Sequence, residues 1–430
     1  MKVGNLSMEL KALSPSASLL AALLHLHCLC VTTFAFVGVA TQIQRRTGGP
    51  SVLVKASTSE SSILPTANSI SIDNEDDVEQ PSSSSSCRVL LLDHLNINHE
   101  KGRHDVVKAF YFDFLGCSID PRKYDNYLSG KKTVWANIGM HQFHLPEGEP
   151  KAQVFQGMIT ILHSNLDVLM ERYNRYLDGE KDDKLAPLQN TEFLVGMLDN
   201  EMMLVTDPWG NEFCILPSDD PIEDRAANIG SQPTLDGHVE SEGLAMEDIT
   251  VYVPHTANLD GISRFYEYVF GAPTLEDLSS LESNSISIAM GERQTLTFQY
   301  HPDGMDADDE VEHHEFRYHD EENDGDSSSD QPFYPSNYGP HISLYVSNLS
   351  HAYKQAEKLN VLYVNRRFER QAYTLDEAID QCMFRVLDII DPLDENKEVI
   401  LRLEHEVRST TTRDGRKYKS CPLLDVSGVN

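Results

Sequence analysis

The sequence repeats one pattern four times between residues 88 and 407: an alternating strand, an amphipathic helix and three short strands. The four copies begin at RVLLLDHLNINH, GMITILHSN, MEDITVYV and PHISLYV. A unit of this kind leaves one face of its small sheet open, so it needs a partner unit to complete a cleft. The repeat therefore predicts an α+β fold in which βαβββ units pair and form curved mixed sheets.

Two seven-residue motifs recur at the same place in the first and third units. FYFDFLG spans Phe110–Gly116 and FYEYVFG spans Phe265–Gly271, each on the helix predicted after the first strand. Apolar residues three and four positions apart give each helix one apolar face, and glycine follows as a stop signal. A third motif, DPWGN at Asp207–Asn211, combines a proline-fixed turn with a glycine that tolerates positive φ, which predicts a hairpin.

In these motifs the sequence resembles the vicinal-oxygen-chelate superfamily, which includes glyoxalase I, bleomycin-resistance proteins and extradiol dioxygenases. Modules of that family open with a strand and a helix bearing FY…LG, and they close with DP-x-GN before the last strand. The resemblance covers residues 88–217 and 244–407, which implies two tandem modules joined by a linker at 218–243. The second module matches less closely, because DPLDEN replaces DP-x-GN and an acidic insert interrupts it at 301–338.

Period-two alternation assigns polar residues of four strands in the first module to a common face. Apolar neighbours such as Leu95 and Phe143 are expected to pack on helices, so the residues between them face the cleft. The residues assigned to the cleft are His94, Asn96, Asn98, Gln142, His144, Met158, Thr160, Glu212 and Cys214. Two imidazoles, one carboxylate and one thiol on one face predict a binding site in the first module.

Family members that use a metal take one ligand from each of these strands, usually His, Gln or Glu. The matching positions in this sequence are His94, His144, Met158 and Cys214. Met158 is a poor ligand for hard divalent ions, whereas Glu212 lies on the same face as Cys214. The resemblance therefore implies a two-His-one-carboxylate centre of His94, His144 and Glu212 for Ni, Zn, Fe or Mn. The alternative interpretation is that these side chains bind water or an organic ligand without a metal.

The second module offers a poorer set of matching residues. They are Asp248, Thr297, His341 and either Arg402 or Ile400. Because Arg402 would oppose a cation, we interpret this module as degenerate, with a structural or ligand-shaping role in which His341 contributes to ligand binding. The histidines interpreted as loop or surface residues are His99, His104 and His163.

Two functions from different classes remain open. As an enzyme, the chain would be a metal-dependent lyase, isomerase or oxygenase acting on a small substrate with vicinal oxygens, because a cation stabilises an oxyanion formed beside a carbonyl. Glu212 is the candidate catalytic base, and an isomerase is weakened if Glu212 is also a metal ligand, whereas an oxygenase needs no such base. As a binding protein, the chain would sequester a small organic molecule without catalysis.

The net charge of the chain limits the classes of partner that it can bind. The formal charge of −33, from 68 acidic and 35 basic residues, argues against a role that follows a phosphate backbone. We therefore expect a small-molecule partner and no nucleic acid, while the sequence indicates no particular oligomeric state.

The first sixty residues have the features of a targeting sequence. No acidic residue occurs between Glu9 and Glu60, and a long apolar run there precedes a basic, hydroxyl-rich stretch. This combination resembles the two-part plastid presequence of algae with secondary plastids, so residues 1–60 are predicted to direct import into a plastid and to meet membranes only during targeting. The alternatives are a secretory signal and a signal anchor. Residues 61–87 are predicted to be a flexible linker, and residues 408–430 a polar tail.

Overall fold

The computed structural model describes residues 87–130, 132–148, 152–179, 184–198, 201–219, 225, 240–275, 284–302 and 340–423. All described helices and strands belong to one compact unit, formed by Ser84–His301 and Met305–Asn430. The predicted presequence and nearly all of the linker at 61–87 and of the acidic insert fall outside the described residues, so they stay predictions. Among the helices that are described, none is both long and apolar enough to cross a bilayer.

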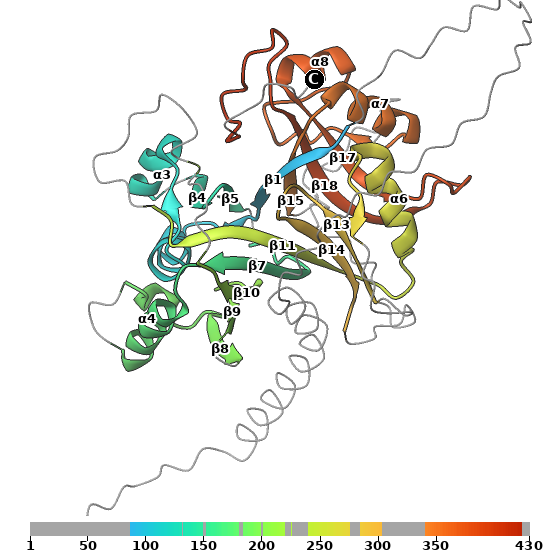
Figure 1. Ribbon diagram of the computed structural model, residues 1–430. Coiled ribbons are helices and arrows are strands. Elements are labelled where there is room, and N and C mark those ends of the chain that lie inside the picture. The colour runs from blue at the N-terminus through green and yellow to red at the C-terminus, as the bar shows by residue number, and fades with distance from the viewer. Residues whose placement is uncertain are drawn as a thin grey trace, which may run out of the picture. The chain divides into compact units, whose positions relative to one another are not determined.

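All four predicted units are present, each as a first strand, a helix and three further strands (Figure 1). The first unit comprises β1 (Val89–Asn96), α2 (His104–Val107) continued by the π-helical segment η1 (Lys108–Phe114), β3 (Ser118–Ile119), β4 (Val134–Ile138) and β5 (His141–Leu145). The second comprises β7 (Gly157–His163), α4 (Leu166–Asp178), β8 (Leu194–Leu198), β9 (Met202–Thr206) and β10 (Glu212–Pro217). The third comprises β11 (Gly243–Val253), α6 (Leu259–Phe270), β12 (Thr274–Leu275), β13 (Ser285–Ala289) and β14 (Thr295–Tyr300). The fourth comprises β15 (His341–Val346), α7 (Leu349–Leu359), β16 (Leu362–Tyr363), α8 (Leu375–Gln381), β17 (Met383–Ile390) and β18 (Val399–Ser409).

The first and second units also contain shorter helices and strands. They are β2 (His99–Glu100), η2 (Pro121–Lys123), α3 (Tyr124–Ser129), β6 (Glu147–Gly148) and η3 (Ala186–Leu188). The helix stop signals found in the sequence are confirmed, because Gly271 caps α6 in the left-handed conformation and Gly116 adopts a φ of 66° after η1. The apolar faces predicted for these two helices are buried.

Strand pairing follows the same rule in every unit. The first strand lies parallel to the last one, and the middle strands continue as an antiparallel meander. The first strand is therefore the open edge of its unit, and two units join when their first strands pair antiparallel, as β1 does with β15 and β7 with β11. The α+β class and the mixed sheets predicted from the sequence are thus confirmed.

The partners of the units differ from the expectation. Within the described residues the two large sheets run β16-β17-β18-β15-β1-β5-β4-β3 and β12-β13-β14-β11-β7-β10-β9-β8. The first unit thus pairs with the fourth, and the second with the third. The prediction that one face combines strands of residues 88–217 alone is wrong, because β1 and β5 lie in one sheet and β7 and β10 in the other.

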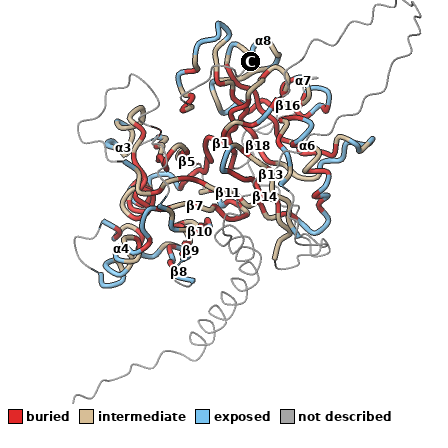
Figure 2. The backbone as a smooth tube through the Cα atoms, in the orientation of Figure 1, coloured by how far each residue is buried: buried red, intermediate tan, exposed pale blue. Residues whose placement is uncertain are grey.

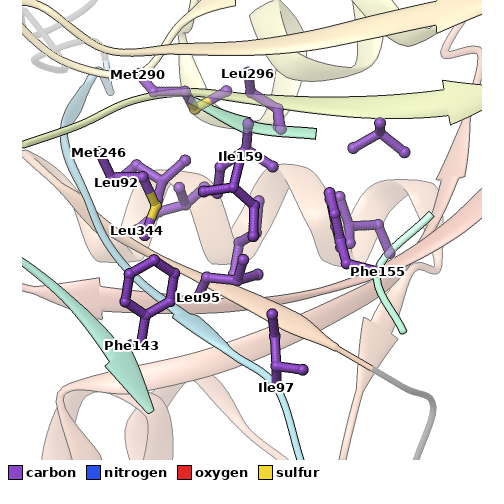
Figure 3. Close-up of a cluster of buried hydrophobic side chains, with 14 of the residues drawn as sticks. Leu92, Leu95, Ile97, Phe143, Phe155, Ile159, Met246, Met290, Leu296 and Leu344 are labelled. Carbon is purple, nitrogen blue, oxygen red and sulfur yellow. The ribbon is translucent and has the colours of Figure 1, made fainter. Parts of the chain in front are cut away.

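Both sheets contribute to one hydrophobic core. Leu92 and Leu95 of β1, Leu344 of β15, Ile159 of β7 and Met246 of β11 are buried in a single cluster (Figure 3). β1 and β15 are buried along almost their whole length, while exposed residues lie mostly on loops and outer helix faces (Figure 2). Burial of this apolar surface, at about 25 cal/mol per Å², is the main force that holds the sheets together.

Polar contacts also join the two sheets. The side chain of Gln294 donates to the carbonyl oxygens of Leu92 and Met246 and accepts from the Leu92 amide, with donor–acceptor distances of 3.0–3.2 Å. His141 of β5 accepts a hydrogen bond from the Met246 amide of β11 at its Nδ1, at 3.0 Å. Burial lowers the pKa of His141 to about 4, so the imidazole is neutral near pH 7 and keeps this acceptor.

His141 should make stability depend on pH. Its pKa is about 4 in the folded protein and about 6.5 when exposed, so the unfolded chain binds the extra proton and the stabilisation is lost as the pH falls from about 6.5 to about 4. His141→Gln keeps an acceptor for the Met246 amide but does not titrate. We expect it to reduce the slope of the free energy of unfolding against pH by up to about 1.4 kcal/mol per pH unit. Urea unfolding between pH 7.5 and pH 4.5 measures the effect, and equal slopes for both proteins would contradict it.

Gly271 holds α6 close to the start of β1. A Cβ atom added there would lie 1.9 Å from the carbonyl oxygen of Cys87, whereas one added at Gly179, after α4, would meet nothing within 4 Å. Both glycines have positive φ, so alanine carries the same conformational penalty of about 1 kcal/mol at either position.

We expect Gly271→Ala to lower the free energy of unfolding by at least about 2 kcal/mol more than Gly179→Ala, because the added atom must push the backbone apart. Equilibrium unfolding in urea gives both values. Equal losses would show that the contact between α6 and β1 contributes nothing beyond the turn itself.

Candidate metal centre

Polar side chains gather on one face of the sheet that joins the first and fourth units. His94 pairs in register with Gln142 of β5 and with Ser343 of β15, and Asn96 pairs with His144 and His341. Directly opposed residues in a sheet project to the same side, so these side chains share one face. β18 extends the face, since Glu404 lies opposite His341 and Glu406 opposite Ser343.

Three of these residues can hold one metal ion. A ring nitrogen of His94, a ring nitrogen of His341 and a carboxylate oxygen of Glu406 all lie within 4.8 Å of one another. His341 Nε2 is 3.8 Å from Glu406 Oε2, and the His94 and His341 rings meet edge to face with centroids 5.7 Å apart. All three residues are buried. Two imidazoles and one carboxylate suit divalent metals of the Fe, Ni and Zn class.

Hydrogen bonding orients His94 for this role. Its Nδ1 lies 2.9 Å from Asp93 Oδ2, so the Nδ1–H group donates to the carboxylate and the lone pair resides on Nε2. Among the described residues, His94 Nε2 is buried and has no hydrogen-bond partner. A buried nitrogen without a partner costs about 1–3 kcal/mol, and a bound cation would remove that cost. The residues present therefore fit a metal ion.

Asp93 is itself held by two arginines. Arg225 donates to Oδ1 at 2.5 Å and Arg408 to Oδ2 at 3.2 Å. Burial alone would raise the pKa of Asp93, but Arg225, His94 and Arg408 together hold it well below its usual range. The carboxylate thus stays ionised and keeps the His94 ring in place.

The protonation states suit cation binding. Burial lowers the pKa of His94 to about 4 despite the neighbouring Asp93, and burial together with Arg385 lowers the pKa of His341 well below its usual range. Burial would raise the pKa of Glu406, but Arg408 and Arg385 hold it well below its usual range. Near pH 7 the imidazoles are therefore neutral and the carboxylate is charged, as metal ligands must be.

Glu406 is also part of a buried ion-pair network. Arg385 bonds to Glu406 and to Glu404, while Arg408 donates to Glu406 Oε1 at 2.5 Å. Asn365 donates to the remaining oxygen of Glu404 at 2.9 Å. The arginines compete with a cation for the charge of Glu406, yet each carboxylate oxygen offers two lone pairs and can serve both partners.

His144 lies beside the three ligands in a stack of rings. Its ring centroid is 3.6 Å from that of His94 and 4.4 Å from that of Trp135. Arg122 and Lys123 cover the Trp135 ring at 4.7 and 4.4 Å from its centroid. His144 Nε2 lies 3.1 Å from the side-chain oxygen of Gln142. The structure thus brings His144 next to His94, and its role as a ligand stays a prediction.

Glu212 is not part of this centre. It lies on β10, in register with Met158 of β7 and Thr206 of β9, and is exposed. The predicted set of His94, His144 and Glu212 is therefore wrong as a single site, because β10 belongs to the other large sheet. For the same reason Glu212 is not the base of this centre.

The remaining predicted site residues divide between the two sheets. Asn96 and Gln142 are buried on the face of the histidines, and Gln142 donates to Asp120 and Asn137 at 2.7 and 2.6 Å. The predicted site residues on the other sheet are Met158, Thr160 and Cys214. Thr160 of β7 lies opposite both Cys214 of β10 and Asp248 of β11. That face has Asp248 accepting from three threonine hydroxyls, Thr250, Thr295 and Thr297.

The sequence pattern did not reveal Glu404, Glu406 and Arg385. It placed the fourth-unit ligand at Arg402 or Ile400, whereas the structure has Glu406 beside His341. The signal was present in LRLEHEV, where apolar residues alternate with Glu404 and Glu406. Opposite β17, the strand β18 carries extra residues between Val399 and Leu401 and between Arg402 and His405, so its alternation cannot be counted from the strand start to Glu406.

Comparison with known proteins gives similarity of fold only. No family model matches the sequence, and no curated protein matches it either. Similar solved structures include maize glyoxalase I (12% identity, 75% of this chain, 92% of that one, TM-score 0.39). Another is the 2,3-dioxygenase LapB of a Pseudomonas species (11%, 75% and 92%, TM-score 0.24). A third is the cppA protein of Streptococcus pneumoniae (10%, 75% and 100%, TM-score 0.34).

The TM-scores of these three structures lie below 0.5, so the fold is described from this chain's own sheet order. The four βαβββ units and the mixed sheets are those predicted from the sequence, but the first unit pairs with the fourth and the second with the third.

Removing the charge of Asp93 should destabilise the protein strongly. Asp93→Asn leaves the buried Arg225 without its carboxylate partner, and breaking a buried pair in this way costs about 3–5 kcal/mol. The matched control is Asp414→Asn, which removes an exposed partner of Arg416 and should have little effect on stability, because solvent screens the pair. Urea unfolding at pH 7 compares them, and similar losses would contradict the assigned importance of the buried network.

Proposed function

We propose that the protein binds one divalent transition-metal ion at His94, His341 and Glu406 and acts on a small substrate with two neighbouring oxygens. The observation that carries the proposal is the buried, unpartnered Nε2 of His94, which lies within 4.8 Å of ligand atoms from the other two residues. Ni, Zn, Fe and Mn all accept such a ligand set. When bound, the ion supplies a positive charge that polarises a substrate oxygen.

The protein's own residues define what else the site can do. Asp93 fixes the His94 ring, and Arg385 and Arg408 fix Glu406, so the ligands are held before an ion arrives. His144 and Trp135 form one wall of stacked rings. His94, His144, His341 and Glu406 are each at most 8% exposed, so the proposed substrate is small.

A specific observation favours a second candidate, in which the site binds a small molecule without a metal. Arg385 and Arg408 already neutralise Glu406, so the network is balanced in charge when no cation is present. In that case Arg408 and His144 would serve as hydrogen-bonding groups for an organic ligand.

Elemental analysis separates the candidates. We expect His94→Ala and Glu406→Gln each to lower the bound metal by one ion per chain and to weaken affinity by at least about 100-fold, because each removes a direct ligand. Glu212→Gln serves as the control, since it changes an exposed carboxylate on the other sheet and should keep the ion. Metal content unchanged by His94→Ala would contradict the proposal.

Turnover tests the reaction class. The methylglyoxal–glutathione hemithioacetal probes lyase chemistry, and catechol probes oxygenase chemistry. Any activity found should disappear on chelation and in His94→Ala. If chelated protein and His94→Ala still bind the same compounds with unchanged affinity, the metal-free candidate is supported instead.

A further inference from the structure

A second group of metal-ligating side chains lies where the chain leaves β1. His99 on β2 pairs in register with Glu147 on β6, and His104 begins α2. Gly102 turns the chain between the two histidines with a φ of 79°. Ligand atoms of His99, His104 and Glu147 all lie within 4.8 Å of one another. None of these residues belongs to the centre at His94, and β2 and β6 form a separate two-stranded sheet.

His99 is buried without any polar partner for its ring. It is 1% exposed, and within the described part of the chain neither Nδ1 nor Nε2 has a hydrogen-bond partner. A neutral imidazole has one N–H donor and one lone pair, so both functions are unsatisfied. Leaving buried polar groups unpaired costs about 1–3 kcal/mol each, which makes such a ring rare unless it has a ligand.

His104 is oriented as a metal ligand would be. Its Nε2 lies 2.9 Å from the carbonyl oxygen of Lys132, so Nε2–H donates and the lone pair resides on Nδ1. Within the described residues, His104 Nδ1 is buried and has no partner. Metal-binding histidines usually give their second ring N–H to a carbonyl or carboxylate, as His94 does to Asp93.

Glu147 completes the group with a negative charge. Its Oε1 accepts a weak hydrogen bond from the Gly102 amide at 3.3 Å, and its side chain is only partly buried. Burial, with a smaller contribution from His104, lowers the pKa of His99 to about 4, and burial also lowers the pKa of His104. Both rings are therefore neutral near pH 7, which is the form that binds metals.

We propose that His99, His104 and Glu147 form a second divalent-metal site that fastens α2 and the segment after β1 to β6. Two imidazoles and one carboxylate select borderline ions such as Zn²⁺, Co²⁺ or Cu²⁺ rather than Mg²⁺ or Ca²⁺. The ion satisfies His99 and cross-links a loop whose strand pair is two residues long. Its role is structural, because it joins β2, β6 and the start of α2.

The two tryptophans of the chain report on the two sites separately. The ring centroid of Trp209 lies 6.1 Å from that of His99, whereas Trp135 stacks on His144 beside the first site. In a Trp135→Phe, His94→Ala chain, Trp209 is the only tryptophan, so its emission can be excited selectively over that of tyrosine, and the first site lacks a ligand. We expect Co²⁺ to quench this emission and Zn²⁺ to restore it by competition.

Substitutions of the proposed metal ligands test whether this second site exists. In that background, Glu147→Gln and His99→Ala should weaken Co²⁺ quenching at least about tenfold, while His255→Ala, at an exposed histidine outside both groups, should leave it unchanged. Glu147→Gln changes a partly exposed side chain, so it keeps the test valid if His99→Ala fails to fold, and circular dichroism before metal addition checks folding. Absence of quenching at saturating Co²⁺, or equal quenching in Glu147→Gln, would overturn the site whatever happens at His94.

Discussion

The antiparallel hydrogen bonds between β1 and β15 hold together the sheet on which the candidate metal centre is built. Each unit of this fold has one open edge, its first strand, and the pairing of two such edges is what places His94 opposite the fourth unit. Because β15 lies parallel to β18, the same pairing also brings Glu406 onto the face of His94. The centre therefore depends on a contact between strands from opposite ends of the described chain.

In both groups of metal-ligating residues, a hydrogen bond orients a histidine ring in the same way. In each, one ring nitrogen donates to a fixed oxygen, from Asp93 in one case and from the Lys132 carbonyl in the other. The other nitrogen is buried with its lone pair available. They differ in charge, because two arginines share Glu406, whereas Glu147 accepts from a main-chain amide. The charges of the first group are thus the more nearly balanced. In the second group, more buried ring nitrogens have no hydrogen-bond partner within the described residues.

Much of the fold could be predicted from the sequence, because strand alternation and helix periodicity are local. The four βαβββ units, the buried helix faces and the polar faces of β1 and β5 follow from residues a few positions apart. The partner of each unit could not be predicted in this way. All four first strands alternate similarly, so nothing local distinguishes β15 from β7 as the neighbour of β1.

The site was predicted in part for the same reason. His94 and His144 were found by alternation, and His341 by its match to the family pattern. Glu212 was grouped with His94 and His144 on the wrong pairing of units, and Glu406 was missed because β18 carries extra residues opposite β17. His99 and His104 were interpreted as loop or surface residues because their segment is polar and irregular. They are buried, since β6 and Trp209 cover them in three dimensions.

The pairing of the chain's outer units has a consequence for the order of folding. The second and third units lie next to each other in sequence, so their sheet can close as soon as synthesis reaches β14. The sheet of the outer units must wait for β15 and β18, and its ion pair between Asp93 and Arg408 spans 315 positions. Contacts so distant in sequence form slowly. Until they do, β1 remains a bare strand edge, the feature of a nascent chain most prone to aggregation and most in need of a chaperone.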